Sequence, residues 1–282
     1  MDKAVVQAAF VAAGLSQRVK DVDALAQPSI RLFTVPAEES SLPVGVSKLG
    51  GQPDLPAEIP WPVWNNLPQS FIAQIHLDDL CSYDAQRVLP PRGMLWFFYD
   101  AQQQTFGENP KDVGGWRVLF KEDLSTLQRT SFPAQLPTHS RFSACSIRFA
   151  CELTLPQQPQ LELATFDWTA EEVRRYETLL SQFPDPADRA AIHHRMLGHA
   201  DALQDDMRLQ SQLMTHGVTR SDDLHIDELS KGAPDWQLLL QVDSDEHAGM
   251  RWATAGMIYY WIKLANLQAC LFDETWLVLQ SE

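Results

Sequence analysis

The sequence predicts an α+β fold in which two similar, intertwined sets of antiparallel β-strands are separated by a helical insert and preceded by N-terminal helices. Three observations support this prediction. Apolar and polar residues alternate along two groups of short segments, the stretch between the groups has helical periodicity, and the connections within each group are too short for helical crossovers. We expect one domain over residues 1–282, because neither group is expected to close a sheet alone.

The N-terminal part is predicted to be helical. Residues 2–26 are expected to form one or two helices that break at Gly14, a residue typical of a helix C-terminus. The apolar run in this stretch is interrupted by Gln7 and lacks a clean cleavage site, so we expect an amphipathic helix and not a signal peptide. A strand over 29–35 and a proline- and glycine-rich loop over 36–69 follow.

The two groups of strands form an internal repeat, the first copy over about residues 48–121 and the second over about 236–280. Each copy offers three strands in one order. The middle strand is apolar on both faces and is therefore expected to be central in its sheet. The matching positions are Gln74 and Gln241, Gly93-Met94 and Gly256-Met257, and Trp116 and Trp276.

The segment between the copies is predicted to contain a strand over 142–155 and a helical insert over about 169–231. Thr169 and Glu172 have the spacing of a capping box, and Asp185-Pro186 is typical of a helix start. The expected helices run from Thr169 to about Phe183, from Asp185 to Gly198, from Asp201 (as the N-cap) to Gly217, and over 222–231.

These strands and the KLGGQPDLP (48–56) and LGHADALQDDM (197–207) motifs resemble the YwqG-like family, a domain of unknown function. The resemblance covers roughly residues 40–280 and implies a single α+β domain built from two similar, intertwined halves. It implies no catalytic residues, because none are established for the family. The chain departs from the family pattern at RWATAG (251–256), where relatives typically have a Trp-Gly-Asp-like approach to the last glycine.

The matched glutamines are expected to be structural. A glutamine repeated among apolar residues is typical of a buried, fully hydrogen-bonded amide, here at the pseudo-symmetric seam between the copies. A ligand contact is the alternative interpretation of Gln74 and Gln241.

The charge is unevenly distributed. The formal net charge is −15, and the stretch from Asp201 to Met250 holds eleven acidic residues against three basic ones. Such a field repels nucleic acid and anionic membranes and attracts basic partners. The candidate partner-binding residues are Asp205, Asp206, Asp222, Asp223, Asp227 and Glu228.

The motifs of common enzyme classes are missing from the sequence. It has no P-loop, no dinucleotide-binding glycine pattern and no nucleophile elbow, so we predict no catalytic, cofactor or metal residues. DSDEH (243–247) begins like a calcium loop, but Ala248 and Thr254 stand where the loop needs Gly and Glu. The adjacent His193 and His194 are expected at a helix surface. The four cysteines form no disulfide pattern, since Cys145 and Cys151 are too far apart on one predicted strand and Cys81 and Cys270 are isolated. Free cysteines favour a reducing, cytoplasmic location.

Two functions are compatible with these observations. The first is a non-enzymatic cytoplasmic immunity protein that neutralises a basic, nuclease-type bacterial toxin through its acidic region. The resemblance adds context, because YwqG-like proteins are found among genes of interbacterial toxin systems. The alternative is an enzyme or small-molecule sensor with a pocket at the seam of the repeats, lined by Trp61, Trp64, His76 and Asp243.

Overall fold

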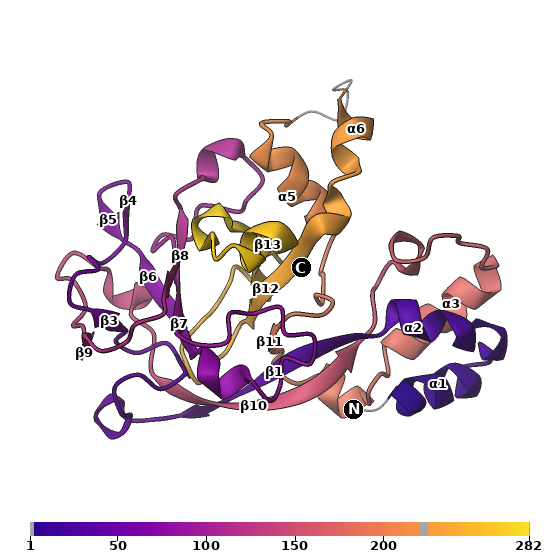
Figure 1. Ribbon diagram of the computed structural model, residues 1–282, viewed down its shortest axis with the longest axis horizontal. Coiled ribbons are helices and arrows are strands. Elements are labelled where there is room, and N and C mark those ends of the chain that lie inside the picture. Colours follow the sequence, from indigo (N-terminus) through magenta and orange to yellow (C-terminus); the bar gives the residue numbers. More distant parts are fainter. Residues whose placement is uncertain (1–2, 220–224, 282) are drawn as a thin grey trace.

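The computed structural model describes residues 3–219 and 225–281 and shows an α+β fold (Figure 1). Its described part contains seven α-helices and a ten-stranded antiparallel sheet that curls into a nearly closed barrel. In order across the sheet, the strands are β14 (Trp276–Gln280), β13 (Met257–Lys263), β12 (Trp236–Asp243), β11 (His194–Met196), β1 (Gln27–Pro36), β10 (Cys145–Thr154), β2 (Lys48–Leu49), β6 (Ser70–His76), β7 (Met94–Tyr99) and β8 (Trp116–Lys121).

The two ends of the sheet approach each other through aromatic side chains. Trp116 and Trp276 lie edge to face with ring centroids 4.8 Å apart, and Phe97 and Tyr260 do so at 5.1 Å. A backbone N–H of β14 donates to the carbonyl of Phe106, so the loop between β7 and β8 covers this edge strand. A covered edge cannot pair with another chain, and the barrel interior between the halves is filled with packed rings.

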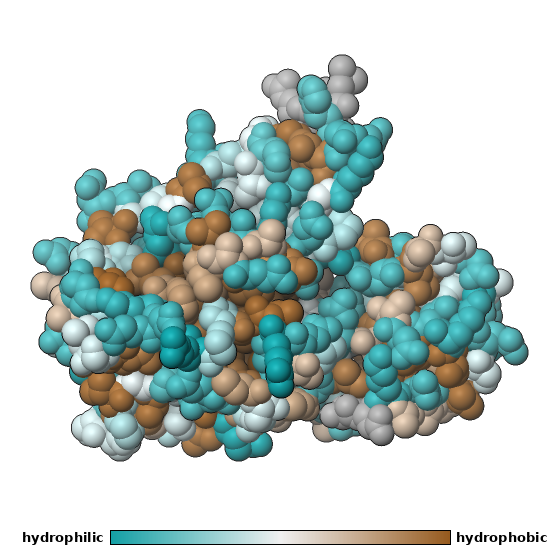
Figure 2. Space-filling model, viewed as in Figure 1, coloured by the Kyte–Doolittle hydropathy of each residue, from teal (hydrophilic) through white to brown (hydrophobic). Residues whose placement is uncertain are grey.

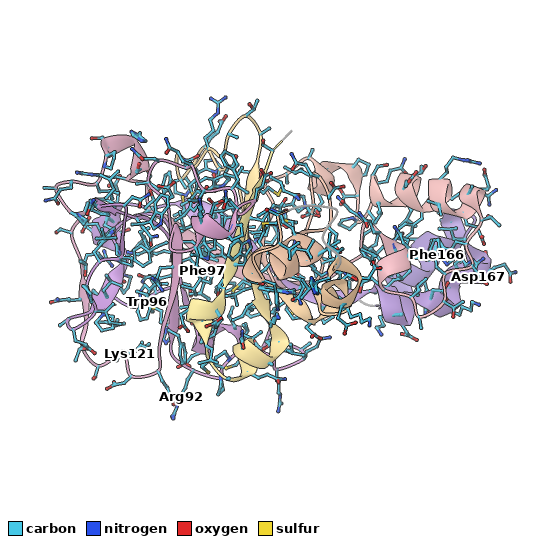
Figure 3. The ribbon with its side chains drawn as sticks, turned by 90° about the horizontal axis from the view of Figure 1, so that it is seen from above. Arg92, Trp96, Phe97, Lys121, Phe166 and Asp167 are labelled. Carbon is cyan, nitrogen blue, oxygen red and sulfur yellow. The ribbon has the colours of Figure 1, made fainter. Side chains whose placement is uncertain are left out.

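Strand β7 is buried on both faces, as predicted for a central strand. Trp96 and Phe97 are neighbours on it (Figure 3) but belong to different apolar clusters. Phe97 contributes to the main core inside the barrel, whereas Trp96 packs outside it with Leu55 and Phe98. Two small sheets lie in the segments that the sequence predicted to be loops: β3 (Asp54–Pro56) pairs with β9 (Leu127–Arg129), and β4 (Val63–Trp64) with β5 (Leu67–Pro68).

The long strands β1 and β10 extend from the barrel towards a separate helical lobe, which is made by α1 (Lys3–Ala12), α2 (Val22–Leu25) and α3 (Ala170–Leu180) (Figure 1). Phe10 and Trp168 pack edge to face against the buried ring of Tyr176. The predicted capping box of α3 is confirmed. Its Glu172 also accepts from Arg18 at 2.8 Å, which joins the first helices to α3. Phe166 and Asp167 lie in this lobe, far from Trp96 (Figure 3).

The prediction of one helix from Asp185 to Gly198 is wrong. Helix α4 (Pro186–Arg189) is short, and the chain then forms β11, which pairs with both β1 and β12. His193 and His194 are buried and not at a surface. The imidazole of His194 lies 3.2 Å from the buried carboxylate of Asp245. The ring can be buried because this carboxylate satisfies its polar nitrogen.

The remaining helices are α5 (Met207–Thr215), α6 (Ile226–Ser230) and α7 (Leu264–Gln268). The prediction that Asp201 caps the third helix is wrong, because the N-cap of α5 is Asp206, whose carboxylate accepts the N–H of Arg208. The insert expected over 169–231 is therefore helical only in part, since β11 lies within it. Among the described residues, no helix combines the length and apolar character needed to cross a membrane.

Candidate functional site

The two predicted structural glutamines are the first polar residues to consider. The amide of Gln74 is fully buried: its carbonyl accepts the N–H of Asp54 at 2.7 Å, and its NH₂ donates to the carbonyl of Val46 and to the Asp54 carboxylate. Its hydrogen-bonding capacity is thus used within the protein, which is the arrangement that a buried amide requires.

Gln241 makes the same set of bonds in the other half of the sheet. Its carbonyl accepts the N–H of Asp201 at 2.9 Å, and its NH₂ donates to the carbonyl of His193 and to the Asp201 carboxylate. It is also fully buried. Both glutamines therefore tie their strand to an earlier segment of the chain through an aspartate, and both amide groups are engaged by the protein itself.

A buried cation approaches each of these aspartates. The Lys48 amine lies 4.0 Å from the Asp54 carboxylate, and the Arg195 guanidinium lies 2.8 Å from that of Asp201. Each cation also donates to the carbonyl oxygen four residues further along the chain. Burial lowers the pKa of Lys48, and the neighbouring carboxylates oppose that effect. The charges compensate each other inside the protein, as buried charges must.

The central strands supply one more matched bond. The indole N–H of Trp96 donates to the Asp54 carbonyl at 2.8 Å, and the hydroxyl of Tyr259 donates to the Asp201 carbonyl at 2.7 Å. The same six contacts thus occur in both halves of the sheet. They form a structural framework and not a reactive site, because each polar group in these contacts is engaged by the protein itself.

The structure places the four residues of the hypothetical seam pocket in local contacts. Trp61 donates to the carbonyl of Gln69, and Trp64 is half-buried in the β4–β5 hairpin. His76 ends β6, with its imidazole 3.7 Å from the exposed Asp78. Asp243 ends β12 and accepts the N–H of His193. The contacts described for Trp61, His76 and Asp243 are local to each residue, and none joins one of the four residues to another. The four residues come from both halves of the sheet.

The candidate acidic residues differ in their surroundings. Asp205, Asp227 and Glu228 are exposed, whereas Asp206 is partly buried and occupied as the N-cap of α5. Glu228 also pairs with the exposed Lys231. Asp222 and Asp223 lie outside the described residues. The acids that the structure leaves exposed are therefore on α6 and just before α5.

A hollow of about 120 Å³, partly open to solvent, lies between the sheet and the 156–162 loop, on the side of the helical lobe. Its walls come from the 156–162 loop, the 198–208 segment and Pro234, with Trp236 and Trp261 on the side of the sheet. Figure 2 shows a notch in the surface between the lobe and the rest of the molecule. This concave region combines aromatic, amide and charged side chains, as ligand sites commonly do.

Three residues that line the hollow, His199, Trp236 and Trp261, carry ring nitrogens with different hydrogen-bonding states. His199 is buried and donates from Nε2 to the carbonyl of Leu25 at 2.9 Å, which leaves Nδ1 as an acceptor. Burial lowers its pKa to about 4, so the ring is neutral at pH 7. The indole N–H of Trp261 is buried and has no hydrogen-bond partner in the part of the chain that the structure describes, whereas that of Trp236 donates to Gln212.

The charged groups of the hollow leave an excess of negative charge. The guanidinium of Arg208 lies 2.7 Å from the Glu162 carboxylate and 3.3 Å from that of Asp206, so it is compensated. The Asp205 carboxylate lines the hollow without a side-chain partner in the described part of the chain. The described residues contain no group of three or more His, Cys, Asp or Glu that could hold a metal ion.

The sequence interpretation did not identify His199, Trp261 or Glu162 as residues of one cavity. His199 was visible only in the LGHADALQDDM motif, which matches KLGGQPDLP by its glycine and aspartate. No sequence signal distinguishes Trp261 from the other aromatic residues of its strand, because its unpaired N–H depends on packing.

The comparisons with known proteins place the domain but give it no activity. No curated protein matches the chain. Residues 47–281 match a family described as a domain of unknown function, DUF1963, which covers all ten strands of the barrel except β1. Because this match spans most of the 282 residues, the chain belongs to the DUF1963 family.

Proposed function

We propose that this protein is a non-enzymatic binding protein that captures a basic partner protein, in the manner of an immunity protein that neutralises a nuclease-type toxin. The observation that carries the proposal is the arrangement of α5 and α6. Helix α6 projects from the molecule (Figure 1) and has no buried residue. Asp227 and Glu228 lie in its first turn and are exposed. An exposed acidic projection is suited to contact with another protein.

We call α6 and the residues that follow it to Asp235 the arm. The exposed acids of the arm make no side-chain contact with the rest of the described structure. Asp227 makes no side-chain bond in the described part of the chain, and Glu228 pairs only with Lys231, at the surface. Asp235 is exposed at the base of the arm. Exposed carboxylates contribute little to folding but raise the rate at which a cationic partner associates. The phosphate-binding surface of a nuclease is such a partner.

Three further parts of the proposal have indirect support. The matched contacts of Gln74 and Gln241 support an origin of the two halves by duplication, and the motifs around them support membership of the YwqG-like group. Cys81, Cys145, Cys151 and Cys270 are all free, which is compatible with a reducing, cytoplasmic location.

The experiment is a pull-down from the native cell with two matched baits. In the first, Asp227→Asn, Glu228→Gln and Asp235→Asn neutralise the arm. In the second, Glu38→Gln, Glu177→Gln and Glu246→Gln neutralise three exposed acids elsewhere. We expect the parent and the second bait to retain a basic protein, and the arm variant to lose it.

Association kinetics with the captured protein then test the mechanism. The arm variant should associate about tenfold more slowly at low salt, and the difference should shrink as salt is added. Equal association rates for the parent and the arm variant at low salt would reject the arm as the binding surface. Retention of no basic protein by any bait would reject the proposed function.

A further inference from the structure

We infer that the hollow between the sheet and the 156–162 loop is a binding site for an arginine side chain presented by a basic partner. The inference rests on the proposed function and names the group that the partner inserts. The arm begins and ends beside the hollow. Helix α5, which precedes the arm, begins at Met207, the chain returns from α6 at Pro234, and both of these residues line the hollow. A partner that extends along α6 to its base at Pro234 therefore reaches the hollow.

The charge of the hollow selects a cation. Three carboxylates line it, those of Glu162, Asp205 and Asp206, against one guanidinium, that of Arg208. Arg208 is paired with Glu162 and Asp206, so it is not available to an anionic ligand. Asp205 is exposed and keeps its carboxylate free for an incoming positive charge.

A second observation, independent of the acids, also indicates a ligand. Trp261 is 5% exposed and lines the hollow, yet its indole N–H has no hydrogen-bond partner among the described residues. A buried donor without an acceptor destabilises the protein, and a ligand that supplies the acceptor removes this cost. An amino-acid residue of a partner offers the missing acceptor in its backbone carbonyl.

Arginine fits this set of groups better than lysine does. Its planar guanidinium stacks on aromatic rings and has several N–H donors, and the hollow offers the rings of Trp236 and Trp261 together with acceptors. The residues that carry acceptors and line the hollow include His199, which is neutral and keeps Nδ1 as an acceptor, and the glutamines Gln157 and Gln237.

The probe is N-acetyl-arginine amide, and N-acetyl-citrulline amide serves as its uncharged isostere. The full-length ¹⁵N-labelled protein is titrated with each while the indole resonance of Trp261, assigned with Trp261→Phe, is followed by NMR. We expect a saturable shift of this resonance with the arginine probe and about tenfold weaker binding of the citrulline probe. Asp205→Asn should weaken binding of the arginine probe about threefold and leave the citrulline probe unaffected. The exposed control Glu246→Gln should change neither.

Equal affinities for the two probes would overturn the inference. It would also be overturned if the Trp261 resonance stayed in place at an arginine-probe concentration that saturates the shifts of other resonances. Because Asp205 is exposed and unbonded, its variant tests the site even if Trp261→Phe does not fold. None of the arm substitutions lies at a residue that lines the hollow. A negative titration with slowed association of the arm variant therefore rejects the hollow alone. The reverse result rejects the arm as the recognition surface.

Discussion

The two halves of the sheet share a framework but differ in what covers it. In the half with Gln74, a second cation is added, since Arg129 of β9 donates to the Asp54 carboxylate, and this carboxylate is fully buried. In the half with Gln241, the carboxylate of Asp201 is 14% exposed. The first half is closed by small sheets, whereas the second half carries α5, α6 and the hollow.

The two halves share the Gln–Asp–cation contacts but differ in the surface that they leave available to a ligand or partner. Both halves need the Gln–Asp–cation contacts to hold a loop against a strand. In the half that is sealed by β3 and β9, the polar side chains of Gln74, Asp54 and Lys48 are engaged by the protein itself. In the other half, the Trp261 indole N–H and the Asp205 carboxylate lie beside a hollow without a partner among the described residues. We therefore expect recognition to occur in the second half.

The largest expected effect comes from removing a buried cation. Lys48→Met leaves the carboxylates of Asp54 and Glu39 with less compensation and should lower the free energy of unfolding by about 3–5 kcal/mol. Arg195→Met should cost less, because both partner carboxylates of Arg195 are partly solvated, whereas the Asp54 carboxylate beside Lys48 is fully buried. Urea unfolding measures both. A smaller loss for Lys48→Met than for Arg195→Met would contradict the view that the first half is the sealed one.

Replacing either matched amide, Gln74 or Gln241, is expected to have the second-largest effect on stability. Gln74→Leu and Gln241→Leu should each lower the free energy of unfolding by about 1–3 kcal/mol, because each removes the amide partner of a backbone carbonyl and of an aspartate N–H and takes one hydrogen bond from the aspartate carboxylate. Gln74→Leu should have the larger effect, since Asp54 is the more deeply buried aspartate. Denaturation of each variant against the parent gives the comparison. Unchanged stability in either variant would show that its amide is dispensable for folding.

Several parts of the fold followed from the sequence. The strands of the matched copies and the α3 capping box were predicted from local patterns, namely alternation and the Thr169–Glu172 spacing. Strand β11 could not be predicted, because three residues that follow a helix start have no periodicity of their own. Its conformation is set by the strands β1 and β12 on its two sides.

The site was less predictable than the fold. The exposed acids could be proposed from composition. No sequence signal separates Asp206, which caps a helix, from Asp205, whose carboxylate has no partner among the described residues. The hollow depends on the packing of the 156–162 loop against the sheet. Segments that are distant in the chain meet there, such as the 156–162 loop and Trp261.

A pH effect distinguishes the halves at a smaller scale. His199 occupies the place that Gln52 has in the first half, and burial lowers its pKa from 6.5 to about 4. Because the folded state disfavours the proton, stability is full above pH 6.5 and is lost as the pH falls towards 4, by up to about 3 kcal/mol. His199→Gln copies the first half and keeps a donor for Leu25. This variant should lose less stability than the parent between pH 7 and about pH 4.5, as measured by urea unfolding at each pH. Identical pH profiles would show that His199 does not contribute.

The smallest effect on stability is expected at the arm. Asp227→Asn, Glu228→Gln and Asp235→Asn together should change the free energy of unfolding by less than about 0.5 kcal/mol, because exposed charges contribute little. Thermal unfolding of this variant beside the Glu38→Gln, Glu177→Gln and Glu246→Gln control checks the value. A large loss in the arm variant alone would make the arm a structural element.

The most direct test of the central claim, that the second half carries the recognition surface, is a map of where a basic peptide binds. Backbone and indole NMR signals of the full chain are followed during titration with an acetylated, amidated hexa-arginine peptide. We expect the shifts to concentrate at Asp205–Arg208, along α6 to Asp235 and at the Trp261 indole, and to be small in β3 and β9. Shifts centred on the first half, or spread evenly over all exposed acids, would contradict it.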